Sequence, residues 1–195
     1  RKKHEEKRQQ VNQWIAKNKK TFAAIVSSAV AMLLVVILTV SILYAPPEGF
    51  KVSINEDGSL TILGCVDHDA SHVEIPSELR YKGKMRKVTS IGEDAFMWCS
   101  LRSIVIPDSV TSIGEGAFCY RDLYEVRYMG SISDWCAIAF GDNQSNPIGY
   151  TDNFYVNGIL IEGELILPDN ITSIGEFAFY GFNALTSVTI GKNVT

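Results

Sequence analysis

Histidine is scarce in this chain of 195 residues, which has only His4, His68 and His72. The sequence also lacks the GxSxG, HExxH, Walker and GxGxxG patterns of common hydrolases, metalloproteases and nucleotide-binding proteins. A nucleophile such as Cys136 has no later histidine to serve as its base, so core packing is favoured for it. We predict a protein with no catalytic centre and no cofactor.

Cysteine is equally rare, and the spacing of the four residues is irregular. They are Cys65, Cys99, Cys119 and Cys136. Such spacing fits neither a disulfide-rich miniature domain nor paired CxxC metal ligands, which favours buried thiols over disulfides or a zinc site.

Two short polar segments have some metal-ligand character. Asp67-His68-Asp69 with His72 offers imidazole and carboxylate groups, but no second ligand group is evident, so a solvated loop is favoured. Residues 55–58, Asn-Glu-Asp-Gly, lack the length and the closing Glu of a calcium loop and are typical of a hairpin turn. We predict no metal site.

Charged residues, proline and glycine are all absent from residues 21–44. A helix over this run would be about 36 Å long, enough to cross a hydrocarbon core of about 30 Å. A buried core helix would need a polar face, and a cleaved signal peptide normally has a shorter apolar run. The sequence therefore predicts a single transmembrane helix at 21–44.

Charge is divided unequally around this run. Residues 1–20 carry a net charge of +6, with eight basic and two acidic residues, whereas residues 45–195 carry −10, with ten basic and twenty acidic ones. Because positive flanks stay inside, we expect 1–20 to be a basic cytoplasmic tail, 45–49 a linker, and the rest an extracellular domain. The negative charge of that domain disfavours nucleic acid as a partner.

A nine-residue block occurs three times between residues 88 and 179. It reads VTSIGEDAF at 88–96, VTSIGEGAF at 110–118 and ITSIGEFAF at 171–179. A second phrase follows each block, with apolar residues spaced L-x-x-I-x-I as in Leu101, Ile104 and Ile106, which predicts a strand with alternate residues facing inward. Units of 22 or 23 residues must stack to bury their apolar face, so we expect a solenoid with parallel strands along one side and a short helical turn at Ala-Phe.

These phrases resemble the BspA-like class of leucine-rich repeats, over roughly residues 60–195. The resemblance implies an α/β solenoid and a bacterial surface protein that takes part in adhesion. We predict an N-terminal cap hairpin and first strand at 50–87 and leucine-rich repeats at 88–195, truncated at the C-terminus. An elongated repeat at about 129–168 contains a hairpin around Asn157-Gly158.

The outward positions of the predicted strands are the candidate binding surface for a protein or glycan. They are His72, Glu74, Ser103, Val105, Glu125, Arg127, Glu164, Ile166, Ser187 and Thr189. The predicted function is a membrane-anchored binding or adhesion module. Two alternatives stay open: the repeats are a targeting spacer of a larger surface enzyme, or the ectodomain of a membrane sensor.

Overall fold

The computed structural model describes residues 32–33, 49–119 and 122–195. The chain divides into two units, Arg1–Ala45 and Pro46–Thr195, and the second contains the repeats. The predicted tail at 1–20, nearly all of the predicted span at 21–44 and most of the linker at 45–49 lie outside the described residues. No helix within the described residues combines the length and apolar character that crossing a membrane requires.

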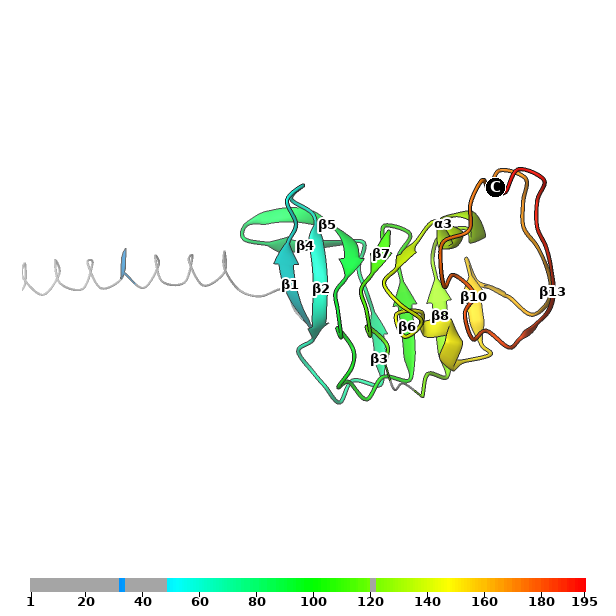
Figure 1. Cartoon of the computed structure of the whole chain (residues 1–195). Helices are drawn as coiled ribbons and strands as arrows, with labels where there is room; N and C mark the ends of the chain where they lie inside the picture. The colour runs from blue at the N-terminus through cyan, green and yellow to red at the C-terminus, as the bar shows by residue number, and fades with distance from the viewer. Residues whose placement is uncertain (1–31, 34–48, 120–121) are drawn as a thin grey trace, which may run out of the picture. The chain divides into compact units, whose positions relative to one another are not determined.

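Two sheets run along the stack of repeats (Figure 1). The first has the order β1-β2-β5-β7-β9, with β4 added to β5. Its strands are β1 (Phe50–Ile54), β2 (Leu60–Cys65), β4 (Glu78–Tyr81), β5 (Lys84–Ile91), β7 (Ser112–Ile113) and β9 (Ala139–Phe140). Pairing from β2 through β9 is parallel, and the first two TSIG phrases contribute β5 and β7 to this ladder. The sequence predicted one ladder of parallel strands, and the structure has two.

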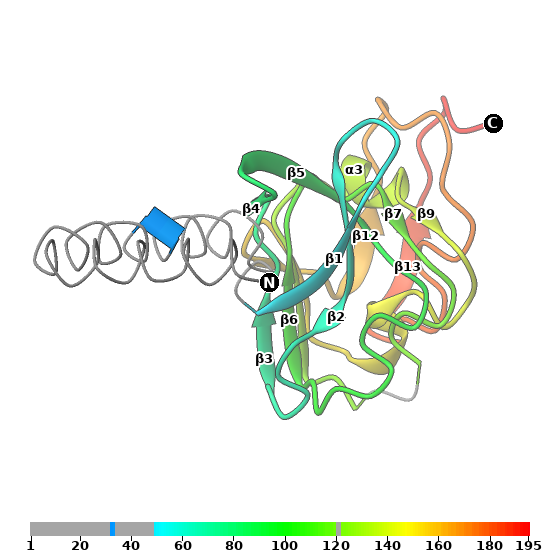
Figure 2. The same cartoon turned by 90° about the vertical axis from the view of Figure 1, so that its left-hand side faces the viewer.

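The second sheet has the order β3-β6-β8-β10-β11. Its strands are β3 (His72–Glu74), β6 (Ser103–Ile106), β8 (Glu125–Tyr128), β10 (Phe154–Val156) and β11 (Ile159–Leu160). β3, β6, β8 and β10 are parallel, and in Figure 2 β3 and β6 lie across the coil from β7 and β9. The predicted alternation is confirmed, because Ile104 and Ile106 are fully buried and Ser103 and Val105 are partly exposed.

A separate two-stranded parallel sheet ends the described stack. It pairs β12 (Gly163–Ile166) with β13 (Leu185–Thr189). Val188 and Ile190 were predicted to face inward, but they are 43% and 56% exposed, because the last described coil has a neighbour on one side only. Helical structure in the described part of residues 49–195 is limited to α3 (Ile132–Cys136) and the 3-10 helix η1 (Pro147–Tyr150).

The glycine of each SIGE phrase lets adjacent coils approach closely. The amide of Gly92 donates to the carbonyl of Ile62 at 2.7 Å, and that of Gly114 donates to the carbonyl of Ile91 at 2.8 Å. A Cβ added at Gly114 would lie 2.6 Å from the backbone nitrogen of Glu93. The recurring glycine therefore follows from backbone contact between coils rather than from a turn that needs positive φ.

The Ala-Phe segments fill the interior between the two sheets. Phe96 and Phe118 are fully buried and stack with ring centroids 5.3 Å apart. The predicted short helical turn is a series of hydrogen-bonded turns, such as Met97 N to Asp94 O at 2.9 Å. Each repeat thus adds one layer to a continuous aromatic and aliphatic core.

Hairpins belong to both of the longer sheets. The hairpin predicted near the N-terminus is β1–β2, and its turn is closed by Asn55 N to Ser59 O at 2.9 Å. The hairpin predicted at Asn157-Gly158 joins β10 to β11, with both turn residues at positive φ. A third hairpin, β4–β5, was not predicted. Both residues of its loop, Lys82 and Gly83, also have positive φ.

Candidate functional site

Four parallel strands bring outward-facing side chains into register across the second sheet. Glu74 pairs with Val105, Val105 with Arg127, and Arg127 with Tyr155. A neighbouring row contains three more side chains. It runs from His72 through Ser103 to Glu125. We call these seven residues the strand face.

Arg127 is held in place from two directions. Its Nε and Nη2 donate to Glu125 Oε1 and Oε2 at 2.7 and 2.9 Å, a bidentate pair between residues two apart on β8. Its Cζ lies 4.4 Å from the centroid of the Tyr155 ring on β10, a cation–π contact. The planar guanidinium is therefore pre-oriented on the face while 41% of the side chain stays exposed.

Electrostatics within the face follow from this pair. The pKa of Glu125 is lowered mainly by its hydrogen bonds from Arg127. The charges of Arg127 and His72 lower it further. The same hydrogen bonds raise the pKa of Arg127. Both groups are held in their charged forms, so the face presents a fixed dipole at neutral pH.

His72 joins the first two strands of the face. Its Nδ1 lies 2.6 Å from Ser103 Oγ, and both side chains lie at the surface. Val105, between Glu74 and Arg127, is the one apolar member of the predicted set on this sheet. The face is thus mixed in character, with charged groups around a small apolar centre.

The predicted site residues do not form a single surface. Six of them belong to the strand face. Glu164 pairs with Ser187 and Ile166 with Thr189 on the separate β12–β13 sheet, where all four are exposed. The elongated repeat interposes β10 and β11 after β8, which interrupts the ladder that the regular repeat spacing had predicted.

Tyr155 is the member of the face that the sequence prediction missed. The hairpin around Asn157-Gly158 was predicted, and strict alternation from the inward Phe154 and Val156 places Tyr155 outward. The sequence signal was therefore present. The sequence did not show that β10 lies beside β8, which is what brings Tyr155 to the strand face.

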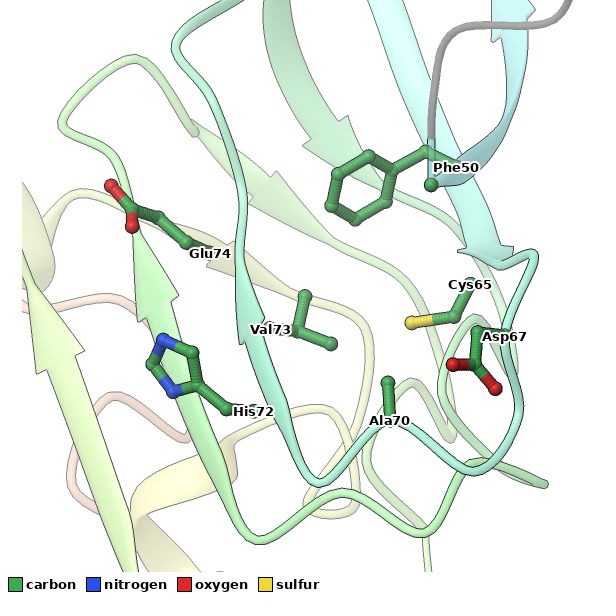
Figure 3. A pocket seen from close by; sticks show the side chains of 8 residues that line it. Phe50, Cys65, Asp67, Ala70, His72, Val73 and Glu74 are labelled. Carbon is green, nitrogen blue, oxygen red and sulfur yellow. The ribbon is translucent and has the colours of Figure 1, made fainter.

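A small cavity of about 170 Å³ opens beside β3, at the N-terminal end of the second sheet. In Figure 3 the apolar side chains of Phe50, Val73 and Ala70 converge on it, while His72 and Glu74 point to the other side of β3. It is smaller than the roughly 300–1,000 Å³ of small-molecule sites. The cavity therefore does not extend the strand face into a ligand pocket.

The metal-like segments have local structural partners. Asp67 Oδ1 accepts from the amide of Asp69 at 3.0 Å, and His68 Nδ1 lies 4.0 Å from Cys99 Sγ. Asp57 Oδ1 accepts from the amide and hydroxyl of Ser59, as a hairpin turn requires, and these bonds lower the pKa of Asp57. Among the described residues no group of three or more His, Cys, Asp or Glu side chains is arranged to hold a metal.

Cys136 is 1% exposed at the end of α3 and packs with Leu165, Leu167 and Ile171. Burial raises the pKa of its thiol to about 11. A thiol in that state is protonated at neutral pH and is a poor nucleophile. The prediction that Cys136 packs in the core is confirmed.

Residues 161–195, including the third SIGE block and its strand, match the family model for a BspA type leucine rich repeat region (6 copies). Over these residues the chain is similar to BspA-type leucine-rich repeats. No curated protein matches this chain.

Two solved structures share the fold. One is a leucine rich cell surface protein from Faecalibacterium prausnitzii A2-165, at 21% identity and a TM-score of 0.53, covering 75% of this chain and 42% of that one. The other is a leucine-rich repeat protein from Bacteroides capillosus ATCC 29799, at 23% identity and a TM-score of 0.50, covering 72% of this chain and 93% of that one. The chain thus spans less than half of the first structure.

Proposed function

We propose that this chain is a protein-binding module displayed at a cell surface, and that the strand face contacts the partner. The observation that carries the proposal is the arrangement of Arg127, held by Glu125 and Tyr155 at the centre of two in-register rows. Arg and Tyr are enriched among the residues that dominate protein–protein binding energy.

Pre-organisation adds to the case for this face. An arginine normally loses considerable side-chain freedom when it enters an interface, about 0.5–1.5 kcal/mol for a long side chain. The bidentate contact with Glu125 and the stacking on Tyr155 have already restricted Arg127. A partner carboxylate or backbone carbonyl could then bind the exposed part of the guanidinium at a smaller entropic cost.

A protein partner fits this face better than a glycan. Sugar-binding sites commonly offer an open aromatic ring against which a pyranose stacks, and one side of the Tyr155 ring is occupied by Arg127. The mixed charges and the central Val105 are typical of a protein interface. Leucine-rich repeat families are typically binding modules without enzymatic activity, which agrees with this assignment.

Membrane anchoring through residues 21–44 completes the proposal. Its support is the uncharged run and the charge difference between the two flanks. In membrane vesicles the full chain should stay in the pellet after alkaline carbonate extraction. A variant carrying Leu34→Arg and Val36→Arg should be released, and equal release of the two proteins would refute the anchor.

Binding can be tested on the full chain in detergent micelles with a phage library of random peptides. Peptides selected against the wild type should bind Arg127→Ala and Tyr155→Ala at least about tenfold more weakly. Arg80→Ala, an exposed arginine of β4 on the other sheet, is the matched control and should bind normally. Selected peptides that bind all four proteins equally would show that the strand face is not the binding surface.

A further inference from the structure

Cys65 and Cys99 lie together at the N-terminal end of the repeats, away from the strand face. Cys65 is the last residue of β2, and Cys99 follows the turn that contains Ala95 and Phe96. Each is 2% exposed, and the Cys99 side chain is near enough to Cys65 to help raise the pKa of the Cys65 thiol. The chain thus brings two cysteines from separate structural elements close together.

Backbone contacts hold the two segments against each other. Ser100 N donates to His68 O at 2.8 Å, which ties the residue after Cys99 to the loop that follows Cys65. A Cβ added at Gly64 would lie 2.7 Å from Ala95 O, so the end of β2 and the Ala95 turn are in close contact. Backbone contacts on both sides therefore hold the two cysteine-containing segments together.

We propose that Cys65 and Cys99 form an intramolecular disulfide, joining the N-terminal hairpin to the first repeat, when the chain meets a low-molecular-weight disulfide such as oxidised glutathione. His68 Nδ1, 4.0 Å from Cys99 Sγ, takes the Cys99 proton. The Cys99 thiolate attacks one sulfur of the oxidant, whose S–S bond breaks and releases one thiolate. Cys65 then loses its proton and attacks Cys99 Sγ, forming the Cys65–Cys99 bond and releasing a second thiolate. The two cysteine protons leave on the two released thiols, so one disulfide is reduced for each one formed.

The order of attack follows from the surroundings of the two sulfurs. Burial, with the neighbouring Cys99 as a further cause, raises the pKa of the Cys65 thiol to about 12. Cys65 is therefore the second thiol to react, after Cys99 has bound the oxidant. In Figure 3 its sulfur points into the small cavity beside Val73 and Ala70. A thiol of high pKa is a poor leaving group, so the finished disulfide resists exchange.

The bond would close the loop that contains β3, β4 and β5. Closing a loop of this length restricts the unfolded chain, and we expect oxidation to raise Tm by about 5–10 °C. Cys119 and Cys136 are also buried, and both belong to later repeats. They provide matched controls within the same molecule.

The test treats the full chain in detergent micelles with oxidised glutathione, beside a sample kept in dithiothreitol. Intact-mass spectrometry should show the loss of two hydrogens, and a tryptic digest should contain peptides 52–80 and 88–102 joined through Cys65 and Cys99. Trypsin places the four cysteines in four different peptides, so the pairing is read directly from the wild type.

Serine variants separate a specific pair from general oxidation. Cys119→Ser and Cys136→Ser should keep both the two-hydrogen loss and the rise in Tm, whereas Cys65→Ser and Cys99→Ser should lose both. The proposal is overturned by glutathione adducts without a cross-link, by a cross-link mapped to another pair, or by an oxidised wild type with unchanged Tm. If a serine variant fails to fold, the wild-type peptide map alone decides.

Discussion

Trp135 Nε1 donates a hydrogen bond of 2.8 Å to the carbonyl oxygen of Ala178, which lies 43 positions later in the chain. The indole is fully buried on α3 and packs against the rings of Tyr128, Phe140 and Phe154. This side chain connects the elongated repeat with the third SIGE block. The insertion is therefore an integral part of the core.

Replacing Trp135 should destabilise the repeats strongly. Trp135→Ala removes a large buried ring and should lower the free energy of unfolding by about 3–5 kcal/mol. Urea denaturation followed by circular dichroism measures this loss. Trp98, which is 78% exposed, supplies the matched control, and Trp98→Ala should cost less than about 0.5 kcal/mol. Similar losses for the two variants would contradict the structure around α3.

Asn146 performs the same linking role with a polar side chain. Its Nδ2 donates to the carbonyls of Phe177 and Ala178 at 2.7 and 2.9 Å, and its Oδ1 accepts from Ile148 N at 3.1 Å. Asn146→Ala removes all three hydrogen bonds. Ala178 O keeps Trp135 Nε1 and Phe177 O keeps Tyr180 N, but Ile148 N loses its partner, so the change should cost about 1–3 kcal/mol in the same urea assay. Asn143→Ala removes one exposed contact with the Tyr180 hydroxyl and should be nearly neutral. A neutral Asn146→Ala would show that water replaces the amide.

The local parts of this fold could be predicted from the sequence. Alternation at period two places Ile104 and Ile106 inside, and an Asn-Gly pair between two apolar runs specifies the β10–β11 hairpin. Each of these two signals depends on a few consecutive residues only. The structure agrees with both predictions because neither requires knowing which distant segments pair.

The parts that could not be predicted depend on contacts between distant segments. Strand β7 has only two residues, Ser112 and Ile113, and it is a strand because it pairs with β5 and β9. A segment this short has no strand signal of its own in the sequence. The contact of Arg127 with Tyr155 likewise needs β10 to lie beside β8. A repeat period predicts regular stacking and cannot show where an insertion adds a strand of its own.

Because neighbouring coils approach more closely at Gly114 than at Gly92, we expect alanine to destabilise the protein more at Gly114. Gly114→Ala would place a Cβ 2.6 Å from Glu93 N, which is backbone and must shift, so we expect a loss of about 1–3 kcal/mol. Gly92→Ala meets its closest atoms at 3.1 and 3.2 Å and should cost less. Neither glycine needs positive φ, so crowding alone separates them. A loss for Gly92→Ala as large as that for Gly114→Ala would refute this explanation.

The pair of Glu125 and Arg127 should be visible in a titration. Because the folded-state pKa of Glu125 is lowered, mainly by hydrogen bonds from Arg127, the stabilisation is fully present above the unfolded pKa of about 4.3. It is lost as the pH falls through the lower folded value. Carboxyl NMR of the wild type should show Glu125 titrating below the ordinary range, and Arg127→Ala should move its pKa upward. Arg80→Ala, on the other sheet, should leave it unchanged. An unchanged Glu125 pKa in Arg127→Ala would mean that the bidentate contact does not persist in solution, and the pre-organised centre of the strand face would be lost with it.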